Sequence, residues 1–300
     1  MLTPISTKDF KWDLKFNWSK NRNKVLSLID GVDNYQLGAF GGNVTLNAQV
    51  GQPYGVLLGT DYTYTADGQK IISATTGKPV KTTTASNVIG NVTPDWNGGI
   101  QSTLTYKNWS FSFLIDVQHG GDIFSLDMYY GMSSGLYAET VYDNDLGNTV
   151  RNPIVYNNPS AATTALKIAS GYAATSGGYI IQGVNVSSTG VVTPNTTRVN
   201  ASTASGFGYA VEPNKAFIYD AGYIKLRELS LSYSLPSKLL KSTFIQGLTF
   251  TATASNPWII SKHLPYADPE SGLGSGNVQG YSVGSLPSTH DYGFNVKLNF

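Results

Sequence analysis

The sequence predicts an all-β chain: a sector of about six to eight antiparallel strands from a large transmembrane β-barrel with long extracellular loops. Three observations support this fold class. Long segments alternate strictly between apolar and polar residues, their connections are short and very long in turn, and only 13% of the 300 residues are charged. Strict alternation is typical of strands with one apolar and one polar face, and a soluble domain carries about 25% charged residues.

The composition excludes several classes of protein. Tyrosine (19) outnumbers phenylalanine (12), and the 32 glycines with abundant Ser, Thr and Asn favour strands and turns. A net charge of +1 and scattered Lys and Arg give no electrostatic support for a nucleic-acid partner. Cysteine is absent, which excludes disulfides and thiolate metal sites. The opening "MLTPISTKDFKW" has no signal-peptide pattern, so an export signal would lie outside this chain.

Six segments have the length and alternation of barrel strands. They lie near residues 9–20, 98–107, 109–118, 223–235, 246–256 and 289–300. In the first of them, "DFKWDLKFNWSK", five apolar and mostly aromatic side chains share one face, which no ordinary soluble surface shows. The opening "MLTPIS" is expected to be the tail of an earlier strand.

The connections between these strands are strongly asymmetric. Short turns alternate with long loops over about 21–96, 119–216 and 257–287, and a hairpin turn is expected at Asp67 and Gly68. Outer-membrane barrels have short periplasmic turns and long outer loops. The asymmetry therefore favours lipid over a protein core as the partner of the apolar face, with a soluble β-sandwich as the alternative. Strand-like pieces in the first loop are either loop structure or two further barrel strands.

In five stretches the sequence resembles the C-terminal part of the SusC/RagA family of TonB-dependent outer-membrane transporters. These stretches are "DFKWDLKFNWSKNRNKVLSL", "IGNVTPDWNGGIQSTLTYKNWSFSFLIDVQHGGDI", "DAGYIKLRELSLSYSLP", "NPWIISKHLPYADPE" and "YGFNVKLNF". The resemblance implies a barrel of 22 strands with an internal plug, located in the outer membrane of a Gram-negative bacterium. It also implies a SusD-like lipoprotein partner and the import of oligosaccharides or peptides.

Six strands cannot close around a plug, and an open sheet edge is not tolerated in lipid. Residues 1–300 are therefore expected to be the C-terminal part of a receptor barrel, with the plug domain and the earlier strands absent. The TonB complex would act through the absent N-terminal region. Outer-membrane lipid and the barrel insertion machinery are further expected partners.

Four motifs carry possible chemistry, and each has a plainer interpretation. "GMSSG" at 131–135 matches a hydrolase nucleophile elbow, but no helical pattern follows it, which favours a surface loop. Asp116, His119 and Asp122 have the spacing of a metal site, yet polar residues are expected where a strand leaves the membrane. Asp268 and Glu270 are interpreted as a loop turn. "GLGSGN" at 272–277 lacks the phosphate-binding pattern. We expect no catalytic residue, cofactor or metal, and therefore no enzyme.

Ligand binding is the function that remains, since aromatic rings and polar loop side chains suit sugars. The expected ligand-binding residues are Trp258, Tyr266, Asp268, Tyr281, Tyr129 and Tyr130. The alternative for each aromatic residue is an interfacial or loop-packing role. The resemblance to the family favours oligosaccharide over peptide as the imported substrate. A surface adhesin or a glycan-binding β-sandwich is the alternative from another class of protein.

The chain ends on a strand with a free aromatic residue. Counting back from Phe300, every second residue is apolar, and such an end resembles the recognition signal for barrel insertion. Phe300, Leu298 and Tyr292 are therefore predicted to form an assembly signal.

Overall fold

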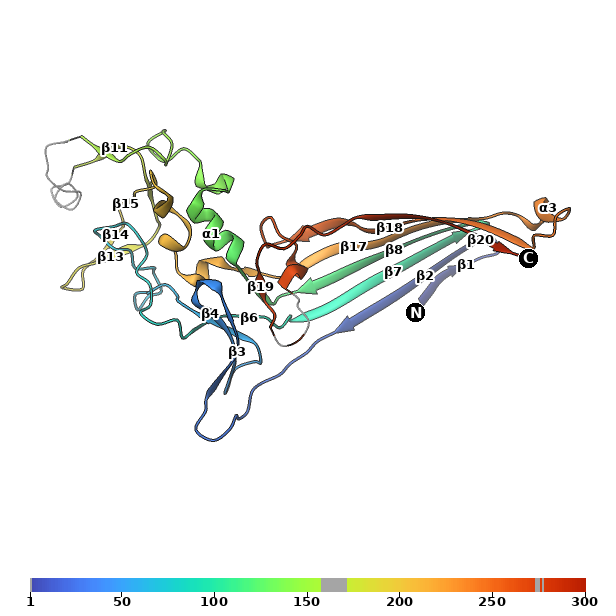
Figure 1. Cartoon of the computed structure of the whole chain (residues 1–300), viewed down its shortest axis with the longest axis horizontal. Helices are drawn as coiled ribbons and strands as arrows, with labels where there is room; N and C mark the ends of the chain where they lie inside the picture. Colours follow the sequence, from blue (N-terminus) through green and yellow to red (C-terminus); the bar gives the residue numbers. More distant parts are fainter. Residues whose placement is uncertain (1, 158–171, 273–275, 277) are drawn as a thin grey trace.

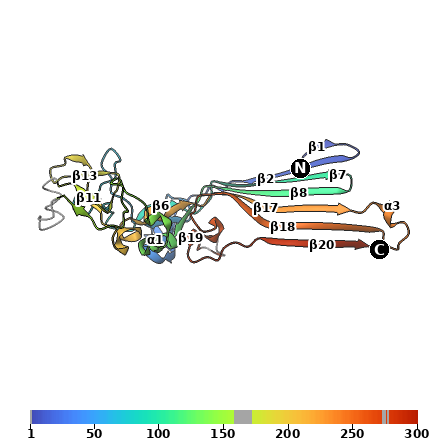
Figure 2. The ribbon, with the colours of Figure 1, turned by 90° about the horizontal axis from the view of Figure 1, so that it is seen from above.

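The computed structural model describes residues 2–157, 172–272, 276 and 278–300. The molecule is elongated, with a long sheet at one end and a region of folded loops at the other (Figures 1 and 2). No helix within the described ranges has the length and hydropathy needed to cross a membrane.

The long sheet has seven strands, all paired antiparallel. In spatial order they are β1 (Leu2–Ser6), β2 (Phe10–Ser19), β7 (Trp96–Tyr106), β8 (Trp109–His119), β17 (Tyr223–Ser234), β18 (Gly247–Lys262) and β20 (Asp291–Asn299). All six predicted strands are present, and the opening residues form the seventh. The sheet is open, with β1 and β20 as its edges, which confirms the predicted barrel sector.

The predicted asymmetry of the connections is also confirmed. The C-terminus and all the short connections, at 7–9, 107–108 and 235–246, lie at one end of the sheet, and the last of these connections contains the short helix α3 (Ser237–Leu240) (Figure 1). The short strand β1 begins opposite Leu14 in the middle of β2, so the N-terminus lies partway along the sheet. The long connections, at 20–95, 120–222 and 263–290, all leave from the opposite end. At Lys107 the backbone has φ 52°, so this residue adopts the left-handed conformation that the tight turn between β7 and β8 requires.

The first long connection folds into a sheet of its own. Its strands are β3 (Asn34–Phe40), β4 (Val44–Gln49), β5 (Val56–Gly59) and β6 (Asn87–Asn91). The alternative of two further barrel strands is therefore wrong, because these strands pair with one another and not with the long sheet. The predicted turn at Asp67 and Gly68 is present, with Gly68 at φ 82°.

The second and third long connections add short elements to the loop region. Three strands form a small sheet: β16 (Ile218–Asp220), β9 (Asp122–Ser125) and β19 (Tyr281–Ser282). Three further pairs are β10 (Val155–Tyr156) with β11 (Ala174–Ser176), β12 (Tyr179–Ile180) with β15 (Arg198–Val199), and β13 (Val184–Val186) with β14 (Val192–Pro194).

A helix, α1 (Leu126–Ser134), follows β9. The hydroxyl of Ser125 caps its N-terminus by accepting from the backbone N–H of Met128 (3.2 Å), and Gly135 at φ 77° ends it. The interpretation of "GMSSG" as a surface loop is wrong, because these residues form the last turn and the C-cap of this helix. The motif "GLGSGN" lies mostly outside the described residues.

The main hydrophobic core lies in the loop region. It is formed where the four-stranded sheet packs against β9, α1 and the segment before β16. Its buried members are Phe40, Val44, Leu46, Leu57, Ile89, Phe124, Met128 and Phe217. The long sheet, in contrast, contributes none of these residues.

Candidate functional site

The register of the long sheet places most of its large apolar side chains on one face, whereas Leu114, Tyr223 and Ile259 lie on the other. Trp12 lies opposite Leu104, which lies opposite Phe111, then Leu231, and the same face continues across β18 to Phe294. These side chains have no protein partner layer: Phe294 is 71% exposed. A contiguous exposed apolar face of this size marks a partner surface. The strands β2, β7, β8 and β20 have nine to eleven residues, the length that spans a bilayer.

Aromatic residues are concentrated at the two ends of this apolar face. Phe10, Tyr106, Trp109 and Tyr233 lie beside one another at the end with the short turns, and the rings of Trp109 and Tyr233 are 4.5 Å apart. At the loop end the corresponding residues are Trp18, Trp96, Trp258 and Tyr292. Two aromatic girdles around an apolar band are typical of outer-membrane barrels, so lipid is the partner that this face fits.

The opposite face of the long sheet is mostly polar. Its side chains alternate with those of the apolar face and include Lys15, Asn17, Gln101, Thr103, Ser112, Asp116, Ser230, Ser232, Thr251, Thr253, Asn295 and Lys297. In a large barrel the inward face lines a water-filled or plugged interior. The polar face therefore presents hydroxyl, amide and charged groups to that interior.

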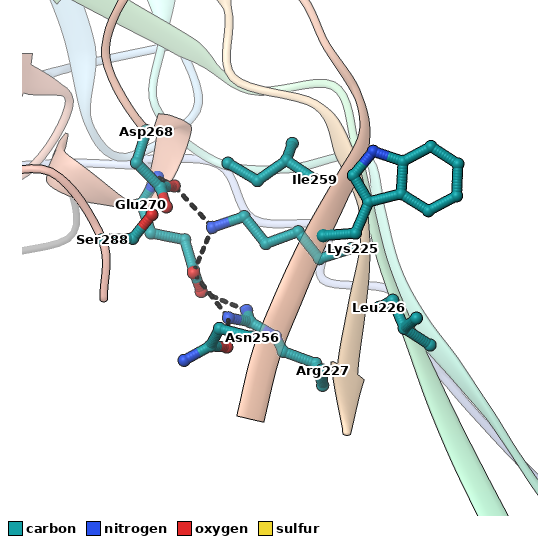
Figure 3. Close-up of a pocket in the computed structure, with 9 residues that line it drawn as sticks. Lys225, Leu226, Arg227, Asn256, Ile259, Asp268, Glu270 and Ser288 are labelled. Carbon is teal, nitrogen blue, oxygen red and sulfur yellow. Dashed lines mark hydrogen bonds and ion pairs between the residues drawn. The ribbon is translucent and has the colours of Figure 1, made fainter. Parts of the chain in front are cut away.

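A cluster of charged residues lies on this polar face at the loop end (Figure 3). Lys225 Nζ is 2.5 Å from Asp268 Oδ1 and 2.5 Å from Glu270 Oε2, and the Lys225 side chain is 4% exposed. Arg227 donates to Asp116 (2.8 and 2.9 Å) and bridges to Glu270 (2.7 Å to Oε2). The residues leave a cavity of about 40 Å³ between them, which is room for about one water molecule.

The charged cluster ties the last long loop to the barrel wall. Lys225 and Arg227 belong to β17, whereas Asp268 and Glu270 come from the loop after β18. Burial alone would raise the pKa of Glu270, but the hydrogen bonds from Arg227 and Lys225 hold that pKa down to about 2. Asp268 and Glu270 do lie in a loop turn, as predicted, but both side chains are also ion-paired to Lys225, more than forty positions away.

Sequence reasoning missed the two basic members of this cluster. A local signal for them exists in "YIKLRELS", where Lys225 and Arg227 occupy polar positions of a predicted strand near its loop end. Two positive charges on the inward face of one strand require acidic partners, since an unpaired buried charge is very costly. The sequence does not reveal which acidic residues fold back to meet them.

The structure relocates Trp258, which was expected in the loop before the last strand. β18 runs to Lys262, so Trp258 is a strand residue. It lies opposite Leu226 on the apolar face and is 60% exposed. This position is that of the loop-end aromatic girdle.

Tyr266 is the most exposed of the predicted ligand-binding tyrosines, at 59%. Its ring stacks on Tyr137 with centroids 4.6 Å apart, and its hydroxyl donates to Glu139 at 2.8 Å. That hydrogen bond from the phenol to Glu139 raises the pKa of Tyr266. The contact joins the last loop to the segment after α1.

The other three predicted tyrosines are brought together in the loop region. Tyr281 stacks on Phe40 (4.2 Å), and Tyr129 packs at the edge of the main core. Tyr130 contacts Tyr129 edge to face and remains 47% exposed. Tyr209, which the sequence analysis did not select, stacks on Tyr129 at 5.1 Å. Only a non-local contact reveals Tyr209, because eighty positions separate it from Tyr129.

The three residues weighed as a metal site have separate roles. Asp116 accepts from Arg227, His119 stacks on Trp96 with ring centroids 5.4 Å apart, and Asp122 accepts from the backbone N–H of Asn91 (2.8 Å). Burial raises the pKa of Asp122. Within the ranges that the structure describes, no group of three or more His, Asp or Glu residues has the arrangement of a metal site.

The predicted assembly residues lie on the edge strand β20 and just beyond it. Tyr292 lies opposite Ala254 and Leu298 opposite Leu248, both on the apolar face. Phe300 follows the last strand residue, is 69% exposed and stacks on Phe244 of the connection before β18 (5.7 Å).

Comparison with known proteins agrees with this architecture. No family model matches the chain. TonB-dependent receptor P3 of Formosa agariphila is 23% identical over 99% of this chain and 27% of its own length. TonB-dependent receptor SusC of Bacteroides thetaiotaomicron is 24% identical over 89% of this chain and 23% of its own length. The chain thus spans about a quarter of the length of the curated relatives it matches.

The fold matches solved structures of the same class. A structure of the RagAB peptide transporter superposes with a TM-score of 0.61 at 18% identity, covering 99% of this chain and 28% of the other. The RagAB peptide importer in its open-open state gives 0.60 at 17% identity, covering 99% of this chain and 27% of the other.

The long sheet, with its apolar face and its asymmetric connections, is a sector of an outer-membrane β-barrel. Over most of its length the chain is also similar in sequence to TonB-dependent receptors, SusC among them, and it is a segment of an outer-membrane protein of a Gram-negative bacterium.

Proposed function

We propose that this chain is the C-terminal barrel segment of a TonB-dependent transporter that imports oligosaccharides together with a SusD-like lipoprotein. The observation that carries the proposal is the two-faced sheet: its apolar face fits lipid and its polar face fits the wall of a solute path. The curated relative SusC and the receptors of Formosa agariphila support import as the activity. Such a segment carries no catalytic step.

The charged cluster has a specific role in this proposal. By pinning Asp268 and Glu270 to β17, it holds the last long loop at the loop end of the sheet. Tyr266 and Tyr130 then project from the loop region as exposed aromatic groups. Aromatic faces at such a position suit the C–H faces of sugar rings, and we include these two tyrosines and Asp268 among the candidate ligand contacts.

Peptide import is the second candidate, because the superposed solved structures are those of a peptide transporter. Growth of a strain that lacks the full-length gene separates the two candidates. Oligosaccharide import predicts lost growth on one glycan as sole carbon source with normal growth on peptides. The reverse pattern would replace oligosaccharide by peptide, and normal growth on both would overturn import of either class.

The assembly role of the last residues is part of the same proposal. The free aromatic end of β20, Phe300, would be read by the barrel insertion machinery, with Leu298 and Tyr292 on the same face. Deletion of Phe300 in the full-length protein should lower the amount assembled in the outer membrane, measured by heat-modifiable gel mobility, without changing the affinity of what assembles. Normal assembly after the deletion would contradict this role.

A further inference from the structure

A pocket lies in the loop region, among residues of the second long connection. Its volume is about 380 Å³, within the range of small-molecule sites. Three segments meet there: the turn that follows Val141, the strand β12 with the residues after it, and the residue after β14. The lining residues are Tyr142, Asp143, Asn144, Asp145, Tyr179, Ile180, Gln182 and Asn195.

Buried polar residues fix the frame of this pocket. Arg198, with a side chain only 5% exposed, forms a two-pronged pair with Asp145 (2.5 and 3.0 Å). The hydrogen bonds from Arg198 lower the pKa of Asp145, so this carboxylate is ionised. The positive charge of Arg198 balances its negative charge. Asn144 donates to the carbonyl of Gly178 (2.9 Å), and Asn195 donates to two backbone carbonyls (2.9 and 3.2 Å). The frame is therefore pre-formed, which reduces the entropy cost of binding.

Other polar groups at the pocket are not used by the protein. The hydroxyl of Tyr142, the carboxylate of Asp143 and the carboxamide of Gln182 have no hydrogen-bond partner within the described part of the chain. The ring of Tyr142 is 43% exposed and meets Tyr179 edge to face at 6.3 Å. Tyr179 is held in place by stacking on Phe207 (5.0 Å). Free hydrogen-bonding groups thus surround a fixed aromatic wall.

This set of groups selects a class of ligand. Carboxylate, carboxamide and phenol groups bind neighbouring hydroxyls, and aromatic rings pack on C–H faces. Ile180 is the only aliphatic lining residue, so the pocket lacks the apolar depth that would hold the side chains of a peptide. Because the Asp145–Arg198 pair is neutral, Asp143 alone leaves one negative charge, which repels acidic ligands.

We propose that this pocket is a subsite for a neutral sugar unit, bound against Tyr142 by Asp143 and Gln182, and that it excludes acidic sugars. The proposal deepens the proposed function and rests on oligosaccharide import. It adds a sugar contact in the outer loops, far along the chain from the wall residues of the sheet.

The test is calorimetric titration of the full-length protein, purified in detergent, with five neutral hexasaccharides (malto-, cello-, xylo-, manno- and laminari-) and with hexagalacturonate. At least one neutral hexasaccharide should bind, and hexagalacturonate should not. Tyr142→Ala should weaken that binding by about tenfold, the value of one aromatic contact. Tyr142→Phe keeps the ring and should retain most of the affinity, which guards against a folding defect. Tyr35→Ala, which removes an exposed tyrosine on β3 (61% exposed), is the matched control and should bind normally.

Four results would overturn the subsite: no binding of any neutral hexasaccharide, preferred binding of hexagalacturonate, tighter binding of a hexapeptide mixture, or unchanged affinity in Tyr142→Ala. Uptake of the bound sugar by cells reports on the proposed function separately. Wild-type uptake combined with unchanged affinity in Tyr142→Ala would remove the subsite alone. Affinity lost in Tyr142→Ala without any wild-type uptake would keep the subsite and remove import.

Discussion

The long sheet and the loop region use apolar side chains in opposite ways. In the loop region the core residues are enclosed, as Phe124 and Leu57 show with 0% exposure. In the long sheet the apolar side chains point away from the protein, and Phe16 is 56% and Trp18 is 67% exposed. The protein itself shields the core of the loop region from water. The apolar face of the long sheet is shielded from water only if it meets lipid.

Because of this difference, the two regions should tolerate different kinds of substitution. A packed core is sensitive to cavities, because its neighbours relax only partly around a lost side chain. A lipid-facing band tolerates changes of shape but not of polarity, because lipid chains fill any space but cannot solvate a charge. Four predictions test the comparison, in order of decreasing effect.

Truncation of a phenylalanine should cost more in the loop core than in the band. Phe124→Ala should lower the stability of the loop region by about 3 to 5 kcal/mol, since it combines lost burial with a cavity. Phe294→Ala, on the apolar face of β20, should cost only about 1.5 to 3 kcal/mol, because lipid replaces the lost atoms. Hydrogen exchange of amides in α1 and in β18, the strand that pairs with β20, measures the two effects, and equal costs at both sites would contradict the comparison.

A charge introduced on the two faces of β20 should have unequal effects. Val296→Lys places a cation in the apolar band beside Phe250 and should cost about 2 to 4 kcal/mol. Asn295→Lys, one residue away on the polar face, should cost little. Urea unfolding in lipid vesicles measures both free energies. Equal tolerance of lysine at the two positions would show that the apolar face meets a protein core.

Acid should release the last loop through Glu270. Its pKa in the folded protein, about 2, lies below the ordinary value of 4.5, so its contribution to stability is complete above the ordinary value and is lost as the pH falls toward 2. The loss should be on the order of 1 to 2 kcal/mol, because about a third of the side chain is exposed and solvent screens the pair. Limited proteolysis of the loop near pH 6 and near pH 3 measures it. Glu270→Gln should abolish this part of the pH dependence, and an unchanged acid response in that variant would assign the effect elsewhere.

The smallest effect concerns a polar contact inside the apolar band. The indole N–H of Trp12 donates to the hydroxyl of Ser102 (3.0 Å), and Ser102 is 3% exposed. Ser102→Ala should cost about 1 kcal/mol, because the indole N–H loses its partner in an apolar setting. Ser112→Ala on the polar face is the control and should cost less in the same unfolding measurement. A larger cost at Ser112 would reverse the assignment of the faces.

The strands of the long sheet could be predicted from the sequence because the environment of each residue there depends on its own strand. Lipid on one face and water on the other impose a two-residue period that distant packing does not override. The bounds of β2, β8 and β20 accordingly lie within about two residues of the prediction.

The loop region could not be predicted in the same way. The strands β3 to β6 and the helix α1 are short, and their shared core joins residues as distant as Phe40 and Phe217. The capping residues Ser125 and Gly135 were a local sign of α1, whereas the pairing of Lys225 with Asp268 had no local sign. The candidate ligand site suffers most from this limit, because it is assembled from loops.

The most direct test of the central claim, that the apolar face meets lipid, is a spin-label accessibility scan along β20. The chain contains no cysteine, so single cysteines can be placed in turn at residues 291–299 of the full-length protein in lipid vesicles. Collisions with oxygen, which concentrates in lipid, should be frequent at Tyr292, Phe294, Val296 and Leu298, whereas a water-soluble nickel complex should reach the positions between them. A scan without this two-residue alternation, or with neither reagent reaching the apolar positions, would contradict the account.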